Sequence, residues 1–197
     1  MFTTKALFLR AMLALAIAVG APAAIAGPMY KVTLDTSEFA GNTGYLDLGY
    51  NGPGDAGPAV ARIENFVGDF FGDAILFDGA AGDVDSGVTI TNLGGFNFFD
   101  KAVVFGNQLS FDIMLDPLGA ANGMLFSVAL FNEDFSAYLG AEGNLLEIAV
   151  LPDMPDTVTP APGAPMDVTA VPEPADWALV LTGVLLIGFI RRMQQGR

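Results

Sequence analysis

Alternating apolar and polar positions recur along the middle of the chain and predict β-strands. Four segments show a period of two, because an apolar residue returns at every second position in 30–34, 46–50, 111–115 and 146–150. Successive strand side chains point to opposite faces, so this alternation is typical of a sheet with one buried face. Turn residues bound five more predicted strands, at 59–66, 74–77, 88–91, 96–105 and 124–132.

The segment 124–132 is apolar at both odd and even positions, which predicts a central strand buried on both faces. About nine short strands at near-regular spacing predict an all-β fold, a β-sandwich over residues 27–150, for which a jelly-roll is one arrangement. Phenylalanine accounts for 16 of the 21 aromatic residues and cannot hydrogen-bond, so we expect most of it in the core. The expected core members are Phe66, Phe77, Phe98, Phe111 and Phe126.

The first 26 residues have the pattern of a secretory signal peptide. Lys5 and Arg10 precede an apolar run at 11–19, and the small residues Ala24 and Ala26 form a cleavage pattern. The run is about half of the roughly 20 residues that a spanning helix needs, which disfavours a permanent anchor. We therefore expect a signal helix over residues 1–26, removed by signal peptidase, and a mature chain that begins at Gly27.

Proline is concentrated after the predicted domain. Seven of the twelve prolines fall between positions 152 and 174. Proline lacks the backbone N–H and cannot continue a helix or a central strand. We therefore expect residues 151–170 to be an extended, semi-rigid linker outside the β-domain.

The last part of the chain has the order short motif, apolar helix, basic tail. Pro172, Glu173 and Pro174 precede the apolar run 177–190, which predicts a short transmembrane helix. Trp177 at its start suits the outer membrane interface, and the arginines after it suit the cytoplasmic side. The basic residues are Arg191 and Arg192.

This arrangement over residues 171–197 resembles the PEP-CTERM sorting signal of Gram-negative bacteria. The Pro-Glu-Pro motif, the aromatic and apolar continuation from Trp177 and the pair Arg191–Arg192 carry the resemblance, whereas Ala175-Asp176 stand where the family often has Ser or Thr. The resemblance implies recognition by the membrane enzyme exosortase, processing near the motif, and association with exopolysaccharide or biofilm matrix. It also implies a precursor held transiently in the inner membrane and a mature form in the periplasm, on the outer surface or outside the cell. An ordinary C-terminal anchor predicts the same topology but gives no reason for the Pro-Glu-Pro.

The middle of the chain also resembles a subgroup of PEP-CTERM proteins of unknown function. The resemblance rests on two stretches, LDTSEFAGNTGYLDLGYNGPG and VTITNLGGFNFFDKAVVFGNQLSFDIMLD. It covers most of the predicted domain. It implies no catalytic residue.

Composition removes several kinds of chemistry. The chain has no Cys and no His, which excludes disulfides, zinc sites built on those residues, and nucleophilic catalysis by Cys or by Ser with a His base. Residues 27–170 hold 20 acidic against three basic residues, a net charge of −17 within a chain of −14. Such a surface repels nucleic acid and anionic lipid and attracts cations, although solubility alone explains it equally well.

Three kinds of site are considered for the middle domain. Asp83 and Asp85 begin a calcium-loop-like stretch, but Gly94 stands where the loop needs Glu, and Asp and Gly are ordinary turn residues. A carbohydrate surface would stack aromatic rings on sugars, and a hydrolase would need two opposed carboxyl groups, of which the sequence singles out no pair. The candidate aromatic residues are Tyr45, Tyr50, Phe70, Phe71, Phe99 and Tyr138.

Together these patterns predict an exported, exosortase-processed cell-envelope or extracellular-matrix protein. Its acidic β-domain would be non-enzymatic, would need no cofactor and could bind polysaccharide. The alternatives are a calcium-dependent binding module and a polysaccharide hydrolase. The expected partners are signal peptidase, exosortase and exopolysaccharide, with the inner membrane as a transient site and no nucleic acid.

Overall fold

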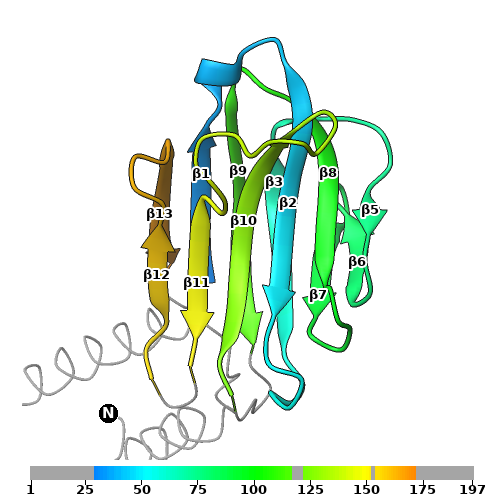
Figure 1. Cartoon of the computed structure of the whole chain (residues 1–197), viewed down its shortest axis with the longest axis vertical. Helices are drawn as coiled ribbons and strands as arrows, with labels where there is room; N and C mark the ends of the chain where they lie inside the picture. Colours follow the sequence, from blue (N-terminus) through cyan, green and yellow to red (C-terminus); the bar gives the residue numbers. More distant parts are fainter. Residues whose placement is uncertain (1–28, 117–121, 152–153, 172–197) are drawn as a thin grey trace, which may run out of the picture. The chain divides into compact units, whose positions relative to one another are not determined.

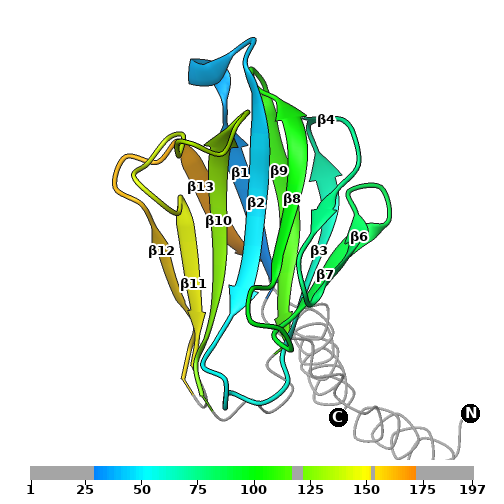
Figure 2. The same cartoon turned by 45° about the vertical axis from the view of Figure 1, so that its right-hand side comes forward.

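A computed structural model describes residues 29–116, 122–151 and 154–171. These residues form two antiparallel sheets that face one another, as Figures 1 and 2 show from two directions. The all-β, sandwich-like prediction is confirmed for them. The predicted signal helix at 1–26 and the predicted transmembrane helix at 177–190 lie outside the described residues.

The first sheet, sheet A, has the strand order β13-β1-β9-β3-β7-β6. Each predicted alternating strand here buries its apolar positions, as Val32 and Leu34 of β1 and Phe111 and Ile113 of β9 illustrate. The strands of sheet A are β1 (Met29–Asp35), β3 (Val60–Val67), β6 (Ala80–Asp83), β7 (Gly87–Thr91), β9 (Gln108–Asp116) and β13 (Met166–Val171).

The second sheet, sheet B, has the order β12-β11-β10-β2-β8-β4, and β5 also pairs with β8. Its inner face supplies Leu46 and Leu48 of β2, Phe99 of β8 and Phe126 of β10 to a core shared with sheet A. The strands of sheet B are β2 (Thr43–Asn51), β4 (Asp69–Phe70), β5 (Ile75–Leu76), β8 (Phe98–Val104), β10 (Met124–Asn132), β11 (Leu146–Val150) and β12 (Thr157–Pro160). A short 3₁₀ turn, η1 (Ser37–Phe39), joins β1 to β2.

The prediction of a spacer over residues 151–170 is wrong for the described part of that segment. β12 pairs with β11 at the edge of sheet B, and β13 pairs with β1 at the edge of sheet A. An edge strand needs hydrogen bonds on one side only, so proline is tolerated there, as Pro160 at the end of β12 shows. The carbonyl of Pro165 also accepts a hydrogen bond from the Asp35 amide at 2.8 Å. The β-domain therefore extends to Val171.

The core prediction for phenylalanine is right for some positions and wrong for others. Phe111 and Phe126 are fully buried, and the Phe66 ring lies 5.6 Å from that of Phe111. Phe77 is 46% exposed, and Phe98 lies on the outer face of β8, opposite the core side that Phe99 occupies. These two rings belong to the outer surface of sheet B.

Candidate functional site

The outer face of sheet B carries a groove of about 630 Å³. Its floor comes from the middle strands β2, β8 and β10, and its walls come from the loops after β5, before β8 and after β10. This volume lies in the range of ligand-binding pockets. The lining residues are Asp47, Asn51, Phe77, Phe96, Phe98, Asp100, Leu125, Ser127, Phe131, Tyr138 and Asn144.

Two carboxyl groups lie side by side on the floor of the groove. Asp47 of β2 is directly opposite Asp100 of β8 in the antiparallel register, and the two side chains share a hydrogen bond. Directly opposite residues have Cβ atoms about 5 Å apart, which brings their carboxyl groups together. Only 4% of Asp100 is exposed, and its Oδ1 atom is buried without a partner among the described residues.

Burial and proximity make this pair hold a proton. Burial, the hydrogen bond with Asp100 and the repulsion of its charge raise the pKa of Asp47 to about 8. Burial also raises the pKa of Asp100, while the hydrogen bond from Asp47 works in the opposite direction. The two carboxyl groups therefore share one proton near neutral pH. At neutral pH the floor presents one neutral carboxyl group and one carboxylate, a combination that both donates and accepts hydrogen bonds.

A glycine shapes the floor next to this pair. Gly49 lies between Ser127 of β10 and Phe98 of β8 in the register. A Cβ atom at Gly49 would lie 2.6 Å from the Phe98 ring and 2.7 Å from Ser127 Oγ. The missing side chain therefore lets the Phe98 ring and the Ser127 hydroxyl approach one another across β2.

One wall is aromatic and is held rigidly by a buried amide network. Asn97 is only 1% exposed, and both its backbone N–H and its side-chain amide donate to Asn51 Oδ1. The side-chain oxygen of Asn97 accepts from the backbone amides of Gly79 and Gly94. Asp78 accepts from the Gly95 and Phe96 amides, both at 2.9 Å. These bonds fix the two loops that present Phe77 and Phe96. The Phe96 side chain is 73% exposed, a large apolar surface with no protein cover.

The opposite wall is formed by rings from β10 and the loop after it. The Phe131 and Tyr138 rings pack with centroids 4.4 Å apart, and the two residues form an isolated β-bridge. Beside them, the Tyr45 ring stacks on Phe135 with a centroid distance of 4.2 Å. Rigid aromatic faces on both sides of a polar floor can hold a ring-shaped polar ligand between them.

The aromatic residues singled out from the sequence separate into two groups. Tyr138 lines the groove and Tyr45 lies beside it, whereas Tyr50 and Phe99 are fully buried in the core. Phe70 packs partly against the core, and Phe71, 46% exposed, lines another pocket. Sequence reasoning missed Phe96, Phe98 and the pair Asp47–Asp100.

The stretch expected to resemble a calcium loop is a hairpin turn between β6 and β7. The Ser86 amide donates to the Asp83 carbonyl, and Gly87 has a φ of +86°, which explains Asp and Gly as turn residues. Asp83 Oδ1 lies 2.7 Å from Lys101 Nζ, and this contact lowers the pKa of Asp83. Within the described ranges, no three metal-binding side chains come together, and the carboxylate of Asp83 is already paired with Lys101, which disfavours a calcium loop at Asp83 and Asp85.

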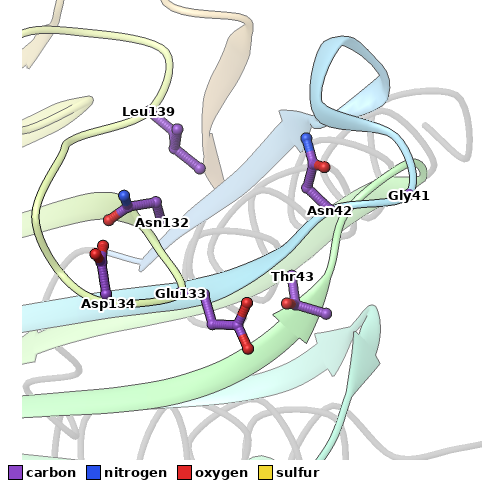
Figure 3. Close-up of a pocket in the computed structure, with 7 residues that line it drawn as sticks. All are labelled: Gly41, Asn42, Thr43, Asn132, Glu133, Asp134 and Leu139. Carbon is purple, nitrogen blue, oxygen red and sulfur yellow. The ribbon is translucent and has the colours of Figure 1, made fainter.

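A second pocket of about 540 Å³ lies at one end of β2 and β10 (Figure 3). Two of its polar side chains, Asn132 and Asp134, are already used by the loop after β10. Asp134 Oδ1 accepts from the Ser136 amide and hydroxyl, and Asn132 bonds to the Ser136 hydroxyl and the Ala137 amide. These bonds lower the pKa of Asp134 and stabilise the loop, so the groove with its unpartnered Asp100 oxygen is the better candidate.

The residues of the predicted sorting signal and cleavage pattern, including Pro172, Glu173, Pro174, Trp177, Arg191, Arg192, Ala24 and Ala26, lie outside the described residues. None of the helices that the structure does describe is long and apolar enough to cross a membrane. In comparisons with known proteins, the chain matches no family model, no curated protein and no solved structure.

Proposed function

We propose that the groove of sheet B binds polysaccharide and does not cleave it. The observation that carries this proposal is the hydrogen-bonded pair Asp47–Asp100 on a polar floor between two aromatic walls. A sugar ring has apolar C–H faces and polar hydroxyl edges. The walls suit the faces, and a carboxyl group beside a carboxylate suits neighbouring hydroxyls, each of which donates and accepts.

The geometry of the pair favours binding over hydrolysis. Glycoside hydrolases flank the scissile bond with two carboxyl groups about 5–9.5 Å apart, which leaves room for the bond or for a water. Asp47 and Asp100 instead lie directly opposite each other on adjacent strands, a register that places their Cβ atoms about 5 Å apart. Their carboxyl groups therefore stand side by side on one face of the sheet and do not face each other across a bond. The polysaccharide hydrolase is therefore the weaker alternative.

A binding experiment tests this proposal. The full-length chain, in mild detergent, is run by affinity electrophoresis through gels that contain different soluble polysaccharides. We expect retardation by at least one polysaccharide, and about fivefold weaker binding for Phe96→Ala and for Tyr138→Ala, from the loss of about 1 kcal/mol of stacking each. The control is Leu93→Ala, which removes a side chain 79% exposed that does not line the groove. Equal retardation of all four chains would remove the groove as the binding site.

We further propose that the protein is exported and processed by exosortase, so that the domain reaches the cell envelope or the extracellular matrix. This rests on the resemblance of residues 171–197 to the sorting signal and on the pattern of residues 1–26. The mass of the mature protein from its native host tests it. The expected product begins at Gly27 and lacks residues 177–197, and a mature protein that retains them contradicts the proposal.

The sandwich is proposed to be of the jelly-roll type. The chain passes repeatedly between the sheets, from β1 in sheet A to β2 in sheet B, back to β3, and later from β8 to β9 to β10. Such crossing between two antiparallel sheets supports that arrangement.

A further inference from the structure

The groove has a concentration of negative charge without a basic partner. Among the residues that line it, none is Lys or Arg. Lys101, the neighbour of Asp100 on β8, points to the other face of the sheet and is bonded to Asp83 and to the Gly72 carbonyl. The pair Asp47–Asp100 therefore takes its compensating positive charge from solvent, as a proton or as a cation.

One oxygen atom at this position has no partner. Asp100 Oδ1 is buried without a hydrogen bond to any of the described residues. Ser127 of β10, on the other side of β2, also lines the groove. A buried polar oxygen without a partner is unfavourable by about 1–3 kcal/mol, so a polar group is expected to occupy this place when the site is filled.

We propose that Asp47 and Asp100 together bind one calcium ion, and that the open side of this ion coordinates hydroxyl groups of the polysaccharide. This inference rests on the proposed function of the groove. The available donors are oxygen atoms only, which suit calcium rather than zinc. Calcium also accepts irregular sets of six to eight oxygens in which water or ligand hydroxyls complete the shell, and the groove is open on that side.

Isothermal titration of the full-length chain with calcium chloride at pH 7 tests the site. The expected result is one calcium ion bound per chain. Asp47→Asn and Asp100→Asn should each abolish it, with circular dichroism to confirm the fold. Asp85→Asn, in the hairpin turn, should leave it unchanged. Binding that survives in the first two variants, or that disappears in Asp85→Asn, overturns the site.

Affinity electrophoresis with calcium and with EDTA separates this inference from the proposed function. If polysaccharide retards the chain only when calcium is present, both the calcium site and the proposed polysaccharide binding are supported. Equal retardation in EDTA overturns the role of the ion and leaves polysaccharide binding intact. Calcium binding without retardation in any gel overturns polysaccharide binding while the ion site stands.

Discussion

Replacement of Asp47 by Asn tests the shared proton directly. Asparagine keeps the shape of the side chain, and its amide N–H can still donate to Asp100, but it cannot ionise. In the folded wild type the pKa of Asp47 is about 8, against an ordinary value of 3.8. Between these two values the folded chain holds a proton that the unfolded chain has lost.

The sign and size of the effect follow from this proton. Because the folded state binds more protons, the free energy of unfolding decreases as pH rises from about 4 to about 8. The slope for one fully retained proton is about 1.4 kcal/mol per pH unit. This stability is fully present below the ordinary pKa and is lost as pH passes through the raised one. In Asp47→Asn the slope should fall by half or more, and burial of Asp100 accounts for what remains.

Urea unfolding of the full-length chain in EDTA, followed by far-ultraviolet circular dichroism at pH 5, 6, 7 and 8, measures this slope. We expect Asp47→Asn to be more stable than the wild type at pH 8 by at least about 1.4 kcal/mol, and the two curves to converge toward pH 5. Asp73→Asn, at an exposed position outside the groove, is the matched control. Parallel curves for wild type and Asp47→Asn would refute a proton shared on the floor of the groove.

Four other substitutions at three places test the packing of the domain, each by urea unfolding at pH 7. Asp83→Ala should lower the free energy of unfolding by about 3 kcal/mol, because it leaves Lys101, only 5% exposed, without its anion. Lys101→Met should lower it by only about 1 kcal/mol, because Asp83 remains 41% exposed. Equal losses in the two variants would contradict this asymmetry. Tyr50→Phe should stabilise the fold by about 1 kcal/mol, since the buried hydroxyl has no partner among the described residues, and a loss of stability would show that it has one. Thr36→Val should lower the free energy of unfolding by about 2 kcal/mol, because the buried Thr36 hydroxyl bonds to two backbone groups of the β8–β9 turn. An unchanged stability would mean that solvent replaces these bonds.

Most strands could be predicted because their alternation is local. The period of two at 46–50 placed Leu46, Leu48 and Tyr50 on the buried face, and the structure buries all three. The segment 124–132 was predicted to be central, and β10 lies between β11 and β2 within the seven-stranded sheet B. Burial on both faces is confirmed for its middle, where Ser127 and Ala129 are buried on the outer side, but Leu125 is 37% exposed.

The edges of the sheets could not be predicted in the same way. β12 and β13 hold few large apolar residues, and their pairing partners β11 and β1 fix them more than their own sequence does. A strand that pairs on one side only has a weak pattern, and nearby prolines further reduce it. The missed strands are therefore those whose stability comes from long-range hydrogen bonds.

The groove was missed for a related reason. Asp47 and Asp100 are 53 positions apart, and only the register of β2 with β8 shows that they are opposite each other. Phe98 and Phe99 are adjacent and equally apolar, yet they point to opposite faces, and a shift of one position would exchange them. One local sign was present, because Asp is depleted in strands and Asp47 lies at the middle of a strongly apolar one.

The β-domain has few basic residues, and their positions leave the carboxyl groups of the groove without a positive partner. The β-domain has only Lys31, Arg62 and Lys101. Lys101 is buried and pairs with the partly exposed Asp83, and Arg62 lies 4.0 Å from Asp116 on the outer part of sheet A. Had the side chain at position 101 pointed outward, an ion pair with Asp47 or Asp100 would have neutralised the groove. Since it does not, the charge of the groove depends on what solvent supplies, and its affinity for a ligand is expected to follow pH and cation concentration.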